Sequence, residues 1–180
     1  MCRQLICLIS FVLALSIASS ASAELVAHWP LDEGSGTTAV DVTGNGHDGV
    51  IGGTASWTAG MNGLAMDFDG TSTYIDVDGE IVRGTWSLAM WLRPRDIPYT
   101  SADQDYYAVM HNDAWSGGTL HLHLRQDTSL LNADFQSGPD VESTTVLQED
   151  EWYHTVITVT DEGTGGSKMY VNGILENEGA

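Results

Sequence analysis

Apolar residues along this chain come in short runs with a period of two, and glycine-rich turns separate the runs. No stretch sustains the 3.6-residue period of an amphipathic helix, and the runs are rich in Val, Ile, Trp and Tyr. The pattern therefore predicts one all-β domain, a sandwich or a barrel. The predicted strands are residues 25–29, 64–68, 74–77, 86–93, 106–111, 119–126, 130–135, 152–160 and 168–171.

Strand 119–126 alternates cleanly enough to assign a face to each side chain. Its three leucines at positions 120, 122 and 124 are predicted to face the core. His121, His123 and Arg125 then point outward together, because successive side chains of a strand lie on opposite faces.

Strands 86–93 and 152–160 carry most of the tryptophans. On the first, Trp86 and the residues in phase with it are predicted to face the core, and Trp91 faces outward with Ser87, Ala89 and Arg93. On the second, Trp152 and His154 share a face and are predicted to lie in the core. There His154 must be hydrogen-bonded, as buried polar groups are. Asn172-Gly173 then predicts a two-residue hairpin, since both positions tolerate positive φ.

The first 23 residues have the form of a secretory signal peptide. Arg3 precedes an apolar run from Leu5 to Ala18, and Ala21-Ser22-Ala23 is a small-residue cleavage site. The run is shorter than the ~20 residues that span a bilayer, so no membrane insertion is expected. The sequence predicts a secreted, extracellular or periplasmic protein, cleaved near Ala23, with one domain over residues 24–180.

Charge narrows the range of partners. Without Arg3, five basic residues remain against 25 acidic ones, a formal charge of −20. Such a surface repels nucleic acid and attracts divalent cations. Both cysteines, Cys2 and Cys7, lie in the removed segment, so no disulfide stabilises the domain.

Four segments carry a family resemblance. They are residues 25–52 (LVAHWPLDEGSGTTAVDVTGNGHDGVIG), 66–77 (MDFDGTSTYIDV), 86–94 (WSLAMWLRP) and 152–173, which joins a W-x-H strand to the hairpin. Together they resemble the laminin-G-like, non-catalytic branch of the concanavalin A-like lectin/glucanase family. The resemblance implies an antiparallel, two-sheet jelly-roll sandwich. It also implies a lectin-like or adhesion module of a larger extracellular protein, which binds carbohydrate or a cell-surface protein. The family's closing strand is not found before Ala180, so the domain is expected to continue beyond it.

A Gly-rich loop gathers candidate calcium ligands. Asp41 and Asn45 lie on it and Asp32 comes just before it, and calcium binds such carboxylate and amide oxygens. Related jelly rolls hold a structural calcium near this loop, which the resemblance implies here. The alternative is that Asp and Asn are present because they form turns.

Catalysis has one candidate row. Alternation puts Asp76, Asp78 and Glu80 on one face, and glucanases of this fold place their acid and nucleophile in such a row. Gly79 interrupts the strand, however, and shared fold does not confer activity. A glycoside hydrolase and a structural spacer therefore remain alternatives to a binding module.

A ligand-binding face is predicted around Trp91, His121, His123 and Arg125, where an aromatic platform would lie beside polar donors. The alternatives are an ordinary exposed sheet face and a zinc site, for which a third ligand is missing. Trp115, in a turn-rich loop, is either a lid over the core or a sugar-stacking residue.

Overall fold

The computed structural model describes residues 23–79, 84–95, 97, 106–111, 120–135, 140–160 and 166–179, and this part of the chain contains strands and no helix. The all-β prediction is confirmed. The strands are β1 (Thr38–Ala39), β2 (Gly49–Gly52), β3 (Ser56–Ala59), β4 (Leu64–Asp67), β5 (Tyr74–Val77), β6 (Trp86–Leu92), β7 (Tyr106–His111), β8 (Leu120–Arg125), β9 (Leu131–Phe135), β10 (Val141–Glu142), β11 (Tyr153–Val159), β12 (Lys168–Val171) and β13 (Ile174–Glu178).

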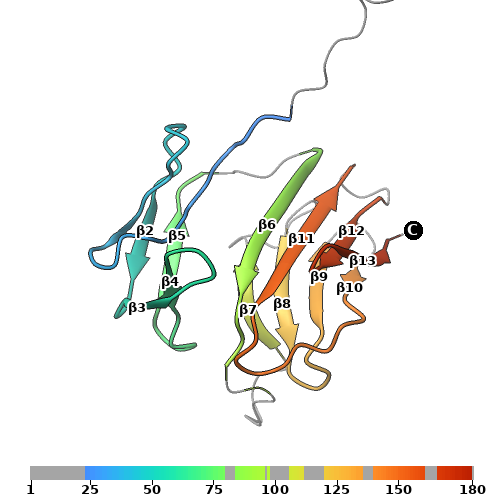
Figure 1. Cartoon of the computed structure of the whole chain (residues 1–180). Coiled ribbons are helices and arrows are strands. Elements are labelled where there is room, and N and C mark those ends of the chain that lie inside the picture. The colour runs from blue at the N-terminus through green and yellow to red at the C-terminus, as the bar shows by residue number, and fades with distance from the viewer. Residues whose placement is uncertain are drawn as a thin grey trace, which may run out of the picture.

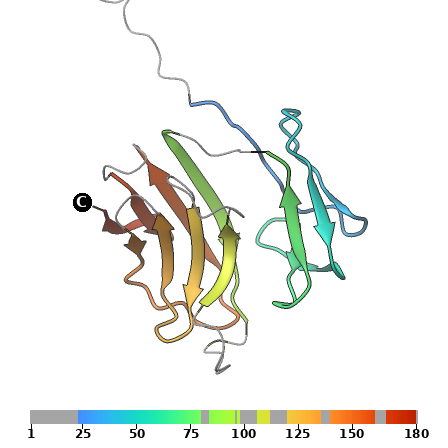
Figure 2. The same ribbon diagram turned by 180° about the vertical axis from the view of Figure 1, so that it is seen from behind.

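Two four-stranded antiparallel sheets form a sandwich. The β11 sheet has the order β13-β12-β11-β6, and the β8 sheet has the order β10-β9-β8-β7. The β11 sheet faces the viewer in Figure 1, and the β8 sheet faces the viewer in Figure 2. The hairpin predicted at Asn172-Gly173 joins β12 to β13, with φ of 51° and 79° at its two residues.

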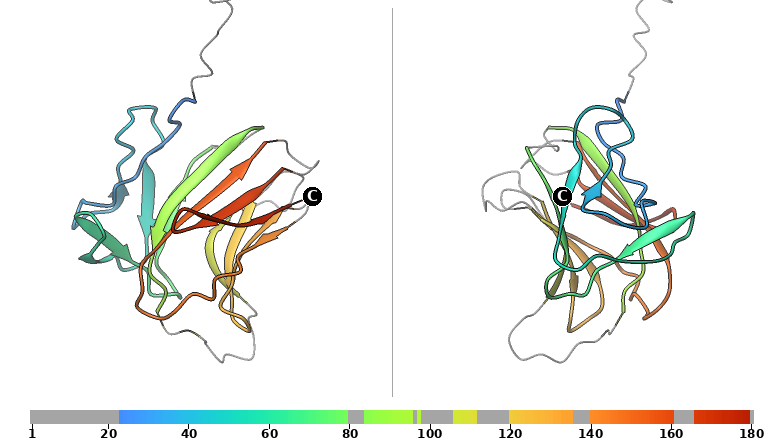
Figure 3. Two further views of the ribbon diagram at one scale, coloured as in Figure 1. Left: turned by 45° about the vertical axis from the view of Figure 1, so that its right-hand side comes forward. Right: turned by 90° about the vertical axis from the view of Figure 1, so that its left-hand side faces the viewer.

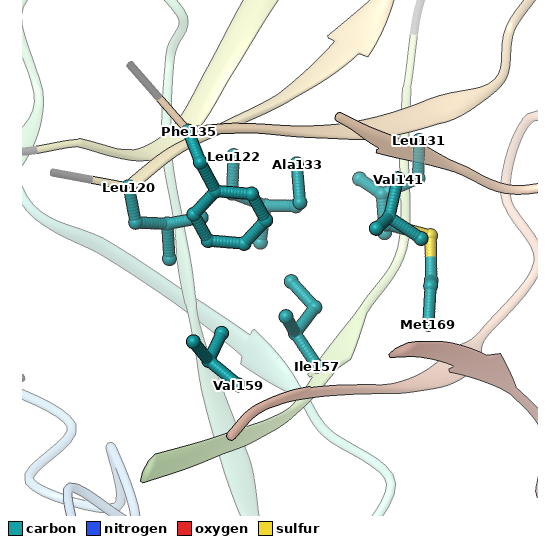
Figure 4. Close-up of a cluster of buried hydrophobic side chains, with 9 residues drawn as sticks. All are labelled: Leu120, Leu122, Leu131, Ala133, Phe135, Val141, Ile157, Val159 and Met169. Atoms are coloured by element: carbon teal, nitrogen blue, oxygen red, sulfur yellow. The ribbon is translucent and has the colours of Figure 1, made fainter. Parts of the chain in front are cut away.

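The inward rows of both sheets form one apolar core. Leucines of β8 and β9 meet Ile157 and Val159 of β11 and Met169 of β12, all nearly inaccessible to solvent (Figure 4). Trp86, Leu88, Met90 and Leu92 of β6 pack against this cluster, as their alternation predicts. Burial of each such side chain contributes roughly 1.5–3 kcal/mol, so this core is the main stabilising feature.

Strands β1 to β5 form a smaller lobe beside the β6 and β7 edge of the sandwich (Figures 1 and 3). β1, β2 and β5 make a three-stranded sheet, and β3 pairs with β4. Ala39, Ile51 and Met66 are the buried centre of this lobe. An ion pair between Arg95 and Asp67 connects it to the segment that follows β6.

Residues 25–29, predicted as a strand, do not form one. Side chains of the Gly-rich loop satisfy their backbone instead. Asn45 donates to the carbonyls of Leu25 and Val26 at 3.1 and 2.9 Å, and Asp41 accepts from the His28 amide at 3.0 Å. Because side chains supply these partners, the alternating sequence is held as an extended segment without a ladder.

The second correction concerns Trp152 and His154, which do not lie in the core. The buried row of β11 is Tyr153, Thr155, Ile157 and Val159, so the residues between them face outward. Both rows carry aromatic and β-branched side chains, so the sequence alone does not show which row is buried. Packing against the β8 sheet determines it.

Candidate functional site

Strands β6 and β11 pair along their full length and present one outward row each. Trp91 lies directly opposite His154 in this register. Their ring centroids are 5.0 Å apart with an interplanar angle of 49°, and Trp91 remains 49% exposed. A tilted aromatic pair of this kind fixes the orientation of the indole while leaving one face open.

A cation–π pair lies immediately beyond these strand ends, between Arg93 after β6 and Trp152 before β11. The guanidinium carbon of Arg93 is 5.4 Å from the centre of the Trp152 ring, within the range of a cation–π contact. Residues two apart on a strand share a face and are separated by about 6.6 Å. Trp91, Arg93, Trp152 and His154 therefore form one surface, which we call the tryptophan face.

The cations of the described residues differ in their partners. Arg95 pairs with Asp67, Arg125 with Asp127 and Glu142, and Lys168 with Glu178. Within the part of the chain that the structure describes, no carboxylate forms an ion pair with Arg93. The tryptophan face thus holds a positive charge that no described carboxylate neutralises.

The outward row of β8 is placed as predicted. His121, His123 and Arg125 are partly exposed, whereas the leucines between them are buried. The ring of Tyr106 lies 5.0 Å from that of His123, and the ring of His111 lies 5.8 Å from that of His121. We call Tyr106, His111, His121 and His123 the histidine face.

Burial favours the neutral form of two imidazoles of the histidine face, His121 and His123. Burial lowers the pKa of His121, with a further contribution from the neighbouring imidazoles of His111 and His123. Burial also lowers the pKa of His123, and the positive charge of Arg125 acts in the same direction.

Asp134, opposite His121 on β9, adds a second perturbed group to this side of the sandwich. Burial and a hydrogen bond with Asp140 raise the pKa of Asp134 to about 6. The negative charge of Asp140 acts in the same direction, because a like charge nearby disfavours ionisation of Asp134.

The predicted ligand face is divided between two surfaces. Trp91 projects from the β11 sheet and the three polar residues of β8 project from the β8 sheet, each away from the shared core. The structure therefore does not bring Trp91 together with His121, His123 and Arg125. It adds Trp152 and His154 to Trp91, which the sequence interpretation assigned to the core.

The Gly-rich loop is organised around Asp41. Its Oδ1 accepts from the amides of His28 and Thr43, its Oδ2 accepts from the amide of His47, and the Thr43 hydroxyl contacts both oxygens. Burial by itself would raise the pKa of Asp41, but these hydrogen bonds outweigh it and hold the pKa far below its ordinary range.

These contacts bear on the calcium prediction. Asn45 points its amide at two carbonyls, and Asp32 accepts from the Leu64 amide at 2.6 Å, so each of the three predicted ligands has its own partners. Across the described residues, no group of three or more His, Cys, Asp or Glu side chains is placed to hold a metal ion. The donors around Asp41 fit the turn-forming alternative rather than a bound cation, and calcium here stays a prediction.

The candidate catalytic row does not continue as a strand. β5 ends at Val77, and Gly79 has a φ of 88°. Asp76 and Asp78 are both exposed. Glu80 and Trp115 lie outside the described residues, as do residues 1–22 of the predicted signal peptide.

Two antiparallel sheets stacked on one core define a β-sandwich of the jelly-roll class, as the sequence predicts. The chain belongs to the concanavalin A-like lectin/glucanases superfamily, whose family model matches residues 68–180. The resembling segment at residues 25–52 lies outside that match.

A solved structure agrees with this fold. It is an S-layer domain-containing protein (residues 221–444) from Clostridium thermocellum, with a TM-score of 0.54 and 20% sequence identity. The similarity covers 86% of this chain and 72% of the other. A search of the curated proteins gave no match. Among the described residues, no helix has the length and apolar character needed to cross a membrane.

Proposed function

We propose that this chain is a secreted carbohydrate-binding module of a larger extracellular protein, and that the tryptophan face is its sugar platform. The observation that carries the proposal is the exposed indole of Trp91, held against His154, with Trp152 and Arg93 at the next position along the same strands. Sugar rings have apolar faces that pack on indoles and hydroxyl groups that bond to neighbouring polar side chains.

The surroundings support a shallow binding site. Ser87, Ala89, Val156 and Thr158 complete the outward rows of β6 and β11 with small or uncharged side chains. A flat surface of this kind suits an extended glycan, whereas enzymes usually enclose a small substrate in a cleft. Membership of a lectin/glucanase superfamily and likeness to an S-layer domain-containing protein agree with an extracellular role.

Hydrolysis is the alternative, and two carboxyl pairs bear on it. Retaining glycoside hydrolysis needs carboxyls about 5 Å apart and inverting hydrolysis needs a larger gap. Asp134 and Asp140 are in direct hydrogen-bond contact, which is too close for either. Asp76 and Asp78 are exposed near the end of β5. Neither pair favours the enzyme.

A glycan array compares the two faces directly. Trp91→Ala should weaken the signal roughly tenfold or more, because an aromatic anchor is lost. His123→Ala, on the opposite face, is the matched control and should leave the signal unchanged. The reverse result would move the site to the histidine face, and the release of reducing sugar by the wild type would favour the hydrolase.

A further inference from the structure

The positive charge of Arg93, which no described carboxylate neutralises, favours one class of sugar, the anionic sugars. The domain has a formal charge of −20 after the predicted cleavage, and each of the other three described Lys and Arg side chains lies against a carboxylate. Acidic partners are thus abundant. That no described carboxylate pairs with Arg93 makes it the exception on this surface.

Stacking positions Arg93 for an external anion. A guanidinium packed on an aromatic ring keeps its N–H groups at its edge, where they can form two parallel bonds to a carboxylate. The ring of Trp152 provides that support at 5.4 Å. Because the side chain is already held in place, binding loses less conformational freedom than it would with a mobile arginine.

The acids nearest in sequence do not occupy this place. Glu149, Asp150 and Glu151 precede Trp152, yet none forms an ion pair with Arg93 among the described contacts. Glu151 instead accepts a hydrogen bond from the hydroxyl of Tyr153, whose side chain is buried on the inward side of β11.

We propose, building on the proposed function, that the glycan taken by the tryptophan face carries a carboxylate, as a uronic acid does. The pyranose ring packs on Trp91 and its carboxylate bonds to Arg93. Trp91 lies on β6 and Arg93 follows the strand directly after Leu92, so the two are i and i+2 in an extended chain, about 6.6 Å apart on one face. That separation suits a ring on the indole with its exocyclic carboxylate directed at the guanidinium.

The test uses two probes that differ only in charge, an oligogalacturonate and its carboxyl-reduced counterpart, titrated against the full chain by calorimetry. The wild type should bind the carboxylated probe about tenfold more tightly, since charge-assisted bonds exceed neutral ones by about that factor. Arg93→Gln should remove this preference and leave the reduced probe unaffected. Arg125→Gln, on the opposite sheet, is the matched control and should change neither affinity.

Each outcome separates the two proposals. If Trp91→Ala weakens both probes while the wild type binds them equally, the uronic acid inference is wrong and sugar binding stands. If Arg93→Gln and Arg125→Gln lower affinity equally, general charge attraction explains the preference and the inference is also wrong. If neither probe binds, uronic acid recognition is overturned, and the glycan array with Trp91→Ala decides sugar binding separately.

Discussion

Glu176 joins the two sheets at the edge of the sandwich away from the small lobe. It lies on β13 of the β11 sheet, and its carboxylate reaches the turn that follows β10 of the β8 sheet. It accepts from the amides of Thr144 and Thr145 at 2.8 Å each, from the Thr145 hydroxyl at 2.9 Å and from the Thr144 hydroxyl. Asn177 of β13 adds one hydrogen bond across these edges, from its side-chain amide to the Glu142 carbonyl at 3.3 Å. Because the Glu176 carboxylate accepts four, replacing it should be costly.

The magnitude follows from the number and kind of these bonds. Hydrogen bonds to a charged group contribute about 1.5–3 kcal/mol each and neutral ones about 0.5–1.5 kcal/mol. Glu176→Gln keeps one acceptor oxygen for the two amides but loses the charge. After allowance for partial exposure to water, it should cost about 1–2 kcal/mol of unfolding free energy. For a domain of this size, that lowers the melting temperature by roughly 3–6 °C.

The pH dependence gives a second, independent measure. Burial would raise the pKa of Glu176, but the bonds from Thr144 and Thr145 outweigh it and lower the pKa. Its contribution is therefore complete above the unfolded pKa of about 4.3 and is lost as the pH falls through the folded pKa. The difference between wild type and Glu176→Gln should be largest at pH 7 and decrease as the pH falls below about 4.3 towards the folded pKa.

Scanning calorimetry from pH 3 to 8 measures both effects. Glu178→Gln is the matched control, because Glu178 is on the same strand and makes only an exposed ion pair with Lys168 at 3.1 Å. That pair should contribute less than about 1 kcal/mol. Equal melting temperatures for the two variants at pH 7, or a difference that does not change with pH, would refute the reasoning.

Four further predictions concern other parts of the molecule. Asp134→Asn should raise the melting temperature at pH 7 and have no effect near pH 4. The pKa of Asp134 is about 6 in the folded state, so its ionisation destabilises the fold as the pH rises above about 4. An effect that does not change with pH would contradict this. Leu122→Ala should cost about 2–5 kcal/mol in denaturant unfolding, since Leu122 is 1% exposed in the main core, and a cost below 1 kcal/mol would place it elsewhere. If calcium binds at Asp41, millimolar calcium should raise the melting temperature and Asp41→Ala should abolish the gain, whereas equal melting with and without chelator leaves the turn-forming role alone. Mass spectrometry of the exported protein should give Glu24 as its first residue, and a retained leader or a lipid on Cys7 would contradict the signal peptide.

Strands could be predicted where apolar and polar residues alternate in the sequence, because one face of such a strand is buried. In β8 the leucines and polar residues alternate without exception, and the structure buries the leucines as predicted. β1, β2, β3 and β10 were missed as strands because they are two to four residues long, and β2 begins and ends in glycine. β13 was also missing from the predicted strands, although the hairpin at Asn172-Gly173 implies a strand after it. Such segments carry too few side chains to show a period.

Residues 25–29 show the limit of local pattern. Leu25, Ala27 and Trp29 alternate as a strand would, but the partners of this backbone are Asp41 and Asn45 of a later loop. The alternation shows which side chains are apolar, but it does not show which groups form hydrogen bonds with the backbone N–H and C=O groups. In β11 the sequence also does not show which of the two alternating rows faces the core. Trp152 and the next residue, Tyr153, are both plausible core residues, and only packing against the other sheet decides between them.

Which residues lie together in the site depends on the order of the strands in each sheet, and the sequence of a single strand does not show that order. Trp91 and His121 each had the correct outward orientation, yet β6 and β8 belong to different sheets, so their outward rows face opposite directions. A one-strand rule predicts a face relative to the core but not the identity of the neighbouring strand. β6 pairs with β11 although the paired residues Met90 and Thr155 are 65 positions apart in the sequence, and this pairing brings His154 and Trp152 to the tryptophan face.

The outer faces of the two sheets carry different charged groups, a difference that the amino-acid composition does not indicate. On the β8 side, Arg125 lies against Asp127 and Glu142, and Asp134 lies against Asp140. Burial lowers the pKa of His121 and His123 there. An anionic ligand therefore meets carboxylates and neutral imidazoles there. On the β11 side, Arg93 packs on the ring of Trp152, and no described carboxylate forms an ion pair with it. The net charge of −20 suggests a surface that repels every anion. Attraction at a few ångströms depends on the groups in contact, however, and at about 0.1 M salt the acids more than about 10 Å away are largely screened. Among the described residues, a cation without a carboxylate partner lies beside an exposed indole on the β11 side, which is why we propose that side for an acidic glycan on a strongly acidic protein.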